Sequence, residues 1–282
     1  MTTAEAVKQL KQHLSLRYDA RETTAMVREI FAHLFGWTPV DIVMHEDKAL
    51  PDFAPARLDA IVERLDSGEP LQYVLGKAWF HGRRYNVTPA TLIPRPETEQ
   101  LVDMILDLYG DRAGLRALDL GTGTGCIAVT LALDLRFPDD VTAVDISRDA
   151  LAVARRNADE LRAAVNLEQT DILALADDGR RYDIIVSNPP YVRMSERALM
   201  APHVTDYEPA NALFVPDDDP LLFYRAIARF AANALNNSGS LFLEINAALA
   251  DDTAQTIARA GLHEVTVHND FNARPRFITA KR

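Results

Sequence analysis

The sequence is short of cysteine, of long apolar runs and of the segments that direct export. Its one cysteine, Cys126, excludes an internal disulfide framework and is expected to be a small buried packing residue. No apolar run approaches the length of a membrane span. The first residues lack the basic and apolar regions of a signal peptide. These absences predict a cytoplasmic protein with no membrane partner. A length of 282 residues predicts one large or two modest domains.

Positive charge is also scarce. The chain has 30 Lys and Arg residues against 41 Asp and Glu residues, a formal net charge of -11. Proteins that follow a nucleic-acid backbone usually carry a basic footprint, so direct nucleic-acid binding is disfavoured. The seven histidines show no Cys/His spacing typical of zinc, and the sequence predicts no metal site.

The most informative segment present is Asn188-Pro189-Pro190-Tyr191, which follows an apolar strand at 182–187. Prolines fix φ and lack an N–H, so the segment is a stiff elbow at the end of a strand. The Asn188 side chain and the Pro189 carbonyl could both accept hydrogen bonds from a planar amino group. The alternative is a plain turn, as in many Asn-Pro sequences.

A second motif lies earlier in the chain. A predicted strand at 116–120 runs into Gly121-Thr122-Gly123-Thr124-Gly125 and then into a helical stretch that starts at Cys126. Glycines permit tight turning and close approach of a ligand to the backbone. The next strand ends in Asp145, 20 residues after Gly125 (145 − 125), the offset expected for a carboxylate that binds ribose hydroxyls.

The chain changes character along its length. Residues 3–68 show apolar positions at helical spacing, and we interpret them as a substrate-recognition domain, with a purely structural cap as the alternative. Residues 78–87 predict a hairpin with its turn near Gly82. A helix is expected from Pro96 towards Leu108. Arg95, held between two prolines, is expected to pair with a carboxylate or to brace the site.

From residue 116 strands and helices alternate, which predicts a doubly wound α/β sheet that is mostly parallel. The last two strands are expected to form an antiparallel addition at one edge. The expected strands lie at 116–120, 141–145, 165–169, 182–187, 240–245, 263–268 and 276–280, with a helix at 247–260.

Taken together, the glycine loop, Asp145 and the Asn-Pro-Pro-Tyr elbow resemble the class I S-adenosylmethionine-dependent methyltransferases. More narrowly, the chain is similar to the peptide chain release factor N5-glutamine methyltransferases. The narrower match rests on Gly68-Glu69-Pro70, Leu92-Ile93-Pro94-Arg95-Pro96-Glu97-Thr98-Glu99, Tyr207-Glu208-Pro209-Ala210-Asn211-Ala212-Leu213 and Tyr224-Arg225.

The resemblance implies a Rossmann-like domain with a seven-stranded, mostly parallel sheet at 97–282. It also implies a small all-helical domain at 1–75 and a β-hairpin linker at 76–96. It implies methyl transfer from S-adenosylmethionine to the side-chain nitrogen of the glutamine in the Gly-Gly-Gln motif of class-I release factors, the protein partners of this family.

The resemblance also assigns roles to residues. Asn188, Pro189 and Tyr191 would be catalytic, and Asn188, Pro189, Pro190, Tyr191 and Arg95 would hold the substrate. The cofactor-binding residues would be Asp119, Gly121, Thr122, Gly123, Thr124, Gly125, Asp145, Ile146, Asp171, Ile172 and Asn188. Asp119 would face the methionine end of the cofactor, or else cap the loop through backbone N–H groups.

The chain departs from the family pattern at three places. Ile172 stands where the family usually has an aromatic residue, so contact with adenine would be aliphatic. Asp219-Pro220 replaces a common Asp-Gly, and Ala273 stands where a glycine is expected.

Other functions remain open on the sequence. Ribosomal-protein glutamine methyltransferases share the elbow, but Pro96 favours the release-factor enzymes. DNA adenine methyltransferases also share it, because an exocyclic amine poses the same geometry; the acidic charge argues against them. A nicotinamide oxidoreductase is disfavoured by the glycine spacing, and a silent binding module by the intact elbow.

Overall fold

A computed structural model describes residues 1–282 and divides the chain into two compact units, Met1–Gly76 and Lys77–Arg282. The hairpin that follows the first unit is part of the second. No helix is both long enough and apolar enough to cross a membrane. Each unit has its own hydrophobic core and is described separately.

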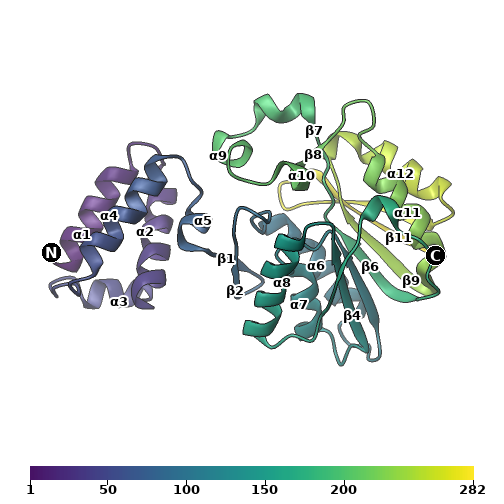
Figure 1. Ribbon diagram of the computed structural model, residues 1–282, viewed down its shortest axis with the longest axis horizontal. Coiled ribbons are helices and arrows are strands. Elements are labelled where there is room, and N and C mark those ends of the chain that lie inside the picture. Colours follow the sequence, from purple (N-terminus) through teal and green to yellow (C-terminus); the bar gives the residue numbers. More distant parts are fainter. The chain divides into compact units, whose positions relative to one another are not determined.

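The first unit is entirely helical, as the apolar spacing predicts (Figure 1). Thr2 begins the first helix with a capping box, in which its hydroxyl accepts from the Glu5 N–H and the Glu5 carboxylate accepts from the Thr2 N–H. Gly36 ends the second helix in the left-handed conformation. The five helices are α1 (Thr3–Leu14), α2 (Ala20–Phe35), α3 (Pro39–Met44), α4 (Ala54–Asp66) and α5 (Leu71–Leu75).

The second unit opens with the predicted hairpin. Strands β1 (Lys77–Phe80) and β2 (Arg83–Asn86) pair antiparallel, with the turn at His81 and Gly82. An extended stretch then leads to α6 (Pro96–Tyr109), which has Pro at its start and Glu97 and Glu99 in its first turn. Both predictions are confirmed.

A seven-stranded sheet forms the centre of this unit, in the order β10-β11-β9-β6-β3-β4-β5. The strands β3, β4, β5, β6 and β9 are parallel, while β11 is antiparallel to both β9 and β10. The antiparallel edge is therefore confirmed. The bounds are β3 (Arg116–Leu120), β4 (Asp140–Asp145), β5 (Asn166–Gln169), β6 (Tyr182–Ser187), β9 (Leu235–Glu244), β10 (His263–Asn269) and β11 (Pro275–Lys281).

Helices cover both faces of the sheet because side chains alternate along each strand. In β6, Ile184 and Val186 belong to one core cluster and Ile185 to the other. Figure 1 shows α7 and α8 on one side of the strands and α11 and α12 on the other. The bounds are α7 (Cys126–Asp134), α8 (Arg148–Leu161), α11 (Leu222–Ala234) and α12 (Ala250–Arg259), the last preceded by a short 3-10 turn, η3 (Ala247–Leu249).

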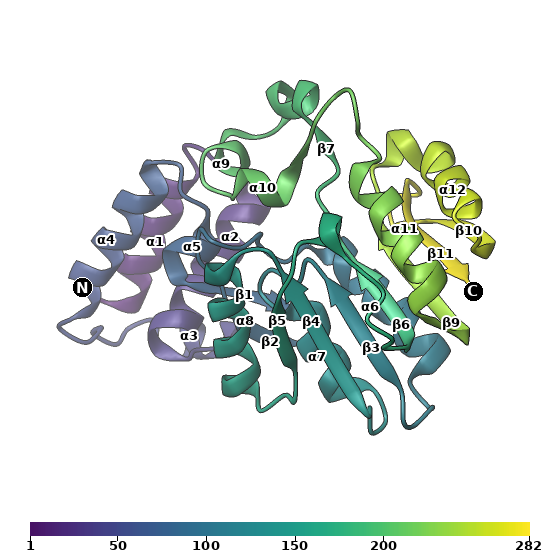
Figure 2. The same cartoon turned by 45° about the vertical axis from the view of Figure 1, so that its right-hand side comes forward.

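The segment between β6 and α11 was not predicted from the sequence. It holds two short strands that pair with each other and three short helical pieces, and Figures 1 and 2 both show it at one end of the sheet. It follows the carboxyl end of β6, where parallel sheets bind ligands. Its elements are β7 (Val192–Arg193), η2 (Met194–Leu199), α9 (Pro202–Thr205), α10 (Ala210–Leu213) and β8 (Phe214–Val215).

Candidate active site

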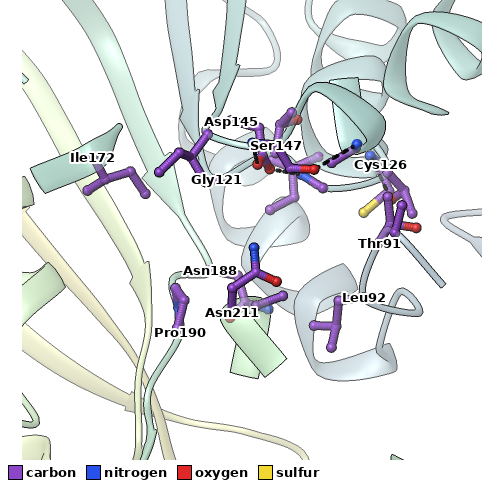
Figure 3. Close-up of a pocket in the computed structure, with 18 of the residues that line it drawn as sticks. Thr91, Leu92, Gly121, Cys126, Asp145, Ser147, Ile172, Asn188, Pro190 and Asn211 are labelled. Carbon is purple, nitrogen blue, oxygen red and sulfur yellow. Dashed lines mark hydrogen bonds between the residues drawn. The ribbon is translucent and has the colours of Figure 1, made fainter. Parts of the chain in front are cut away.

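A cavity of about 270 Å³ lies at the carboxyl ends of the central strands (Figure 3). Segments far apart in the sequence line it: the stretch before α6, the glycine loop, the end of β4, the turn after β5 and the elbow after β6. The lining includes the predicted residues Arg95, Gly121, Thr122, Gly123, Thr124, Asp145, Ile146, Asp171, Ile172, Asn188 and Pro190. One site therefore unites motifs that the sequence places up to 95 residues apart (190 − 95).

The glycine loop forms the floor of this cavity. Gly121, Gly123 and Gly125 have φ values of 77°, 54° and 78°, which side chains rarely adopt. The backbone N–H groups of Gly121 and Thr122 both donate to the Val144 carbonyl at 2.9 Å. A Cβ on Gly121 would lie 3.3 Å from Ile172 Cδ1. The loop is thus a cradle of bare backbone.

Gly125 does not line the cavity. It caps α7, and a Cβ there would lie 3.0 Å from the Ala154 side chain. Its requirement for glycine comes both from its positive φ and from close packing of the loop against α8.

Asp145 lies at the rim of the cradle, at the end of β4. Its Oδ2 accepts from the Gly123 N–H and its Oδ1 from the Ser147 N–H, both at 2.9 Å (Figure 3). A carboxylate oxygen has a second acceptor position. Both oxygens can therefore still receive a hydroxyl, so a bare backbone cradle with a carboxylate at its rim fits the ribose and methionine portions of S-adenosylmethionine.

Asp119 lies below the loop and is almost fully buried. Its Oδ2 accepts from the Thr122 hydroxyl at 2.6 Å, and its Oδ1 has no hydrogen-bond partner. Burial raises the pKa of Asp119 to about 7, and the Thr122 hydroxyl opposes this rise. Asp119 therefore holds the loop through the Thr122 hydroxyl.

The elbow after β6 presents two unused acceptors. The Ser187 hydroxyl donates to the Leu120 carbonyl at 2.6 Å and ties the end of β6 to β3. The Asn188 Nδ2 donates to Thr98 Oγ1 at 3.1 Å, which leaves Oδ1 without a partner. No backbone N–H donates to the Pro189 carbonyl. Figure 3 labels Asn188 among the residues that line the cavity.

Tyr191, which the resemblance assigns to catalysis and to the substrate, does not line the main cavity. It lines a second cavity of about 270 Å³ that shares Leu92, Arg95, Asn188 and Ala212 with the first. Most other residues of the second cavity come from the segment between β6 and α11: Val192, Met200, Val204 and Leu213. Asn188 therefore stands where the two cavities meet.

Behind the elbow lies a buried polar cluster. Thr98 Oγ1 donates to Glu244 Oε2 at 2.7 Å, and the Tyr191 hydroxyl donates to Glu244 Oε1 at 3.0 Å. Burial raises the pKa of Glu244, while these two hydroxyls and the nearby Arg276 oppose the rise. Burial and the Glu244 charge raise the pKa of Tyr191 well above its usual value, so this hydroxyl keeps its proton.

Arg95 pairs with a carboxylate, as the sequence analysis expected, and the pair joins two segments of the site. Its guanidinium forms an ion pair with Glu208, whose Oε2 also accepts from the Ile93 N–H at 3.1 Å. The Glu208 side chain is fully buried. The pair joins the stretch before α6 to the segment that carries α10, and both line the second cavity.

The sequence analysis missed Thr98, Glu208 and Glu244 as parts of the site. Thr98 and Glu208 stand inside motifs that carried the resemblance, but nothing there assigned them a partner. Glu244 had a visible signal, since it is a carboxylate at the end of the otherwise apolar strand Leu241–Leu243. A buried carboxylate must find donors.

The fold and the site define a class I S-adenosylmethionine-dependent methyltransferase. Residues 98–204 match the methyltransferase small domain model and residues 4–76 the PrmC N-terminal domain model. The chain belongs to the release factor glutamine methyltransferase family: it is 43% identical to that enzyme of Bacteroides thetaiotaomicron over 97% of this chain and 98% of the relative. The corresponding enzyme of Flavobacterium psychrophilum is 37% identical over 96% and 95%.

Solved structures agree on the fold. A methyltransferase from Pyrococcus furiosus matches 71% of this chain and 89% of its own, with a TM-score of 0.52 and 19% identity. The 16S rRNA N2 G1207 methyltransferase of T. thermophilus, in complex with AdoMet and guanosine, matches 73% of this chain and 49% of its own, with a TM-score of 0.52 and 19% identity. At this identity the likeness extends to the fold alone.

Proposed function

We propose that the protein transfers a methyl group from S-adenosylmethionine to the side-chain nitrogen of the glutamine in the Gly-Gly-Gln motif of class-I release factors. One observation carries this proposal: Asn188, whose Oδ1 is unused, lines both cavities, and the carbonyl of the adjacent Pro189, a buried residue that lines neither cavity, accepts no backbone hydrogen bond. A primary amide has two N–H donors on one nitrogen and can meet both acceptors.

The bound cofactor supplies an electrophilic sulfonium methyl group. The protein's task is to place the amide nitrogen in line with that methyl group. Two hydrogen bonds from the amide to Asn188 and Pro189 fix the orientation of the nitrogen and raise its electron density. No base is required before transfer, because the proton can leave the nitrogen afterwards.

The two cavities suit the two reactants. We assign the cavity with the glycine cradle and Asp145 to the cofactor, and Ile172 to an aliphatic contact with adenine. The second cavity, with Tyr191 and the apolar Val192, Val204 and Leu213, suits the glutamine side chain and its neighbours. Asn188 lines both cavities and would contact both the cofactor and the glutamine.

The helical unit is proposed to bind the body of the release factor. A glutamine at the tip of a loop offers little contact, whereas a standard protein interface buries about 800 Å² per partner. The helical unit carries a groove of about 520 Å³ between α1, α2 and α3. Val7 and Val27 line the groove, as do the positively charged side chains of Lys8, Lys11 and Arg28.

Such an enzyme would work in the cytoplasm, where translation takes place.

The test is methylation of a purified class-I release factor with labelled cofactor, followed by mass mapping of the modified peptide. We expect a methyl group on the Gly-Gly-Gln glutamine. Asn188→Ala should lower kcat by about 10²- to 10³-fold, as does loss of one preorganised hydrogen-bonding group, while cofactor affinity stays within a few-fold. Asn272→Ala, an exposed change of the same kind, is the control. Modification of a ribosomal protein but not of the release factor would overturn the substrate assignment.

A further inference from the structure

An asparagine can present either end of its carboxamide to a ligand, and only one end serves the proposed reaction. The substrate amide brings N–H donors, so Asn188 must offer Oδ1 and keep Nδ2 away from the nitrogen. Nothing in Asn188 itself decides this, because the two ends of a carboxamide have the same shape. The choice must come from what lies behind it.

The group behind Asn188 is Thr98, and behind Thr98 lies Glu244. Both are buried, with 3% and 1% of their surface exposed. The distances are 3.1 Å from Asn188 Nδ2 to Thr98 Oγ1 and 2.7 Å from Thr98 Oγ1 to Glu244 Oε2. The Thr98 hydroxyl donates its one hydrogen to Glu244 Oε2, and an ionised carboxylate at this position can only accept. Thr98 then has only an acceptor left for Asn188, and Nδ2 must turn towards it.

We propose that Glu244, acting through Thr98, fixes the polarity of the Asn188 carboxamide and thereby selects an N–H-bearing substrate. This inference rests on the proposed function for the identity of that substrate. Glu244 lines neither cavity, so it acts as a positioning residue.

Two neighbours hold Glu244 in this role. The Tyr191 hydroxyl donates to the other oxygen, Oε1, at 3.0 Å, so each oxygen receives one hydroxyl. Burial raises the pKa of Glu244, and the two hydroxyls together with the Arg276 side chain on the adjacent strand β11 oppose that rise. Tyr191 belongs to the same elbow as Asn188, which ties the elbow to the carboxylate at two points.

Glu244→Gln is informative because it keeps the shape of the side chain but reverses the direction of the hydrogen bonds that run from residue 244 through Thr98 to Asn188. Tyr191 would still donate to the amide oxygen, which turns the Gln Nε2 towards Thr98. The Thr98 hydroxyl, which would then accept a hydrogen bond from the Gln Nε2, would donate its own hydrogen to Asn188 Oδ1. Nδ2 would then face the cavity and repel the substrate N–H groups.

The experiment compares kcat and KM of the full chain on a purified class-I release factor. The variants are Glu244→Gln, Thr98→Val, Thr98→Ser and the double variant Thr98→Val/Glu244→Gln. Glu264→Gln and Thr266→Val on the edge strand β10, outside both cavities, are the matched controls. Titration calorimetry with S-adenosylmethionine checks that each variant is folded and binds the cofactor.

We expect Glu244→Gln to lower kcat by about 100-fold with cofactor affinity unchanged. Thr98→Val removes the anchor but imposes no wrong polarity, so it should lose only about 10-fold, and Thr98→Ser should restore activity to within about 3-fold. The double variant should be as active as Thr98→Val, and hence more active than Glu244→Gln alone, a non-additive result. Additive losses, or equal losses in Thr98→Val and Thr98→Ser, would overturn the proposal. Should Glu244→Gln fail to fold, the two Thr98 variants decide alone.

A measurement without substrate separates this proposal from the proposed function. The side-chain NH2 signals of Asn188 can be identified in a ¹⁵N spectrum by their loss in Asn188→Ala. They should exchange slowly with water in the parent protein and faster in Glu244→Gln. Equal exchange would refute the polarity mechanism even if methyl transfer is confirmed. If the Asn188 NH2 hydrogens exchange slowly in the parent protein and faster in Glu244→Gln, but the Gly-Gly-Gln glutamine is not methylated, only the substrate assignment is refuted.

Discussion

Arg95 and Glu208, 113 residues apart in the sequence, form an ion pair in which the carboxylate is fully buried. The same carboxylate accepts from the Ile93 N–H. Two walls of the second cavity therefore depend on one side chain, and the geometry of the proposed substrate site should respond when that side chain changes.

Glu208→Gln should lower both stability and substrate affinity. A glutamine can offer its oxygen to Arg95 or to the Ile93 N–H, while its Nε2 meets the other donor. A buried donor left without an acceptor costs about 1–3 kcal/mol. We expect a loss of about 2 kcal/mol in the free energy of unfolding by urea denaturation, and a higher KM for release factor. Glu264→Gln, an exposed residue, should change neither, and equal effects in the two variants would contradict the bracing role.

Asp145→Ala should weaken cofactor binding more than chemistry. The substitution removes the acceptors proposed for the ribose and also the acceptor for the Gly123 N–H. A lost charged hydrogen bond costs roughly 1.5–3 kcal/mol, which corresponds to a roughly 10- to 150-fold rise in Kd. Calorimetry with S-adenosylmethionine measures this, with Asp149→Ala on the surface of α8 as control. If Kd is unchanged and only kcat falls, the ribose assignment is wrong.

Asp119 should make the protein less stable as pH rises. Its folded pKa, about 7, is raised above the ordinary value of 3.8, so the folded state holds a proton that the unfolded state has released. The free energy of unfolding should therefore fall between pH 4 and pH 7, by up to about 1.4 kcal/mol per pH unit from this group. Asp119→Asn cannot ionise and should flatten the slope in urea denaturation. Asp107→Asn, on the surface of α6, should leave it unchanged; an unaltered slope in Asp119→Asn would show that another group causes it.

Charge reversal in the helical groove should reduce activity on whole release factor selectively. Lys8 and Lys11 line the groove, and the change to glutamate at both positions leaves the sequence of the catalytic unit unaltered. We expect kcat/KM on the protein substrate to fall about 10-fold or more, and kcat/KM on a short Gly-Gly-Gln peptide to stay within about 2-fold, because rim charges act mainly on association. Lys48→Glu, exposed in the same unit but outside the groove, is the control. Equal losses on protein and peptide would mean that the helical unit only stabilises the fold.

Ala273→Gly should stabilise the protein. Ala273 has φ 58°, a conformation that glycine adopts at lower cost, and glycine is the residue that the family resemblance leads one to expect there. We expect a gain of about 0.5–1 kcal/mol in the free energy of unfolding. The same change at Ala152, inside helix α8, should instead cost about 1 kcal/mol. A loss at both positions would show that Ala273 is not strained.

The sequence predicts those parts of the molecule whose signals are local. The hairpin around Gly82, the helix that starts at Pro96 and the order of strand, glycine loop and helix each depend on a few neighbouring residues. Asp145 could be predicted because parallel strands bring their carboxyl ends to one edge.

The polar cluster could not be predicted in the same way. Thr98 and Glu244 meet across 146 residues, and their contact exists only once α6 packs against β9. The segment between β6 and α11 was missed for a related reason. Its strands β7 and β8 have two residues each and show no alternation that a pattern could reveal.

The two acceptors of the elbow also bear on what happens after a single turnover. An unmodified glutamine amide can satisfy Asn188 Oδ1 and the Pro189 carbonyl together, but a methylated amide keeps only one N–H. The product must leave one of these acceptors unpaired, and its methyl group needs room where a hydrogen bond had been. The elbow should therefore favour release of the monomethylated glutamine and oppose a second transfer to the same nitrogen. It would thus limit the reaction to one methyl group as well as bind the substrate amide.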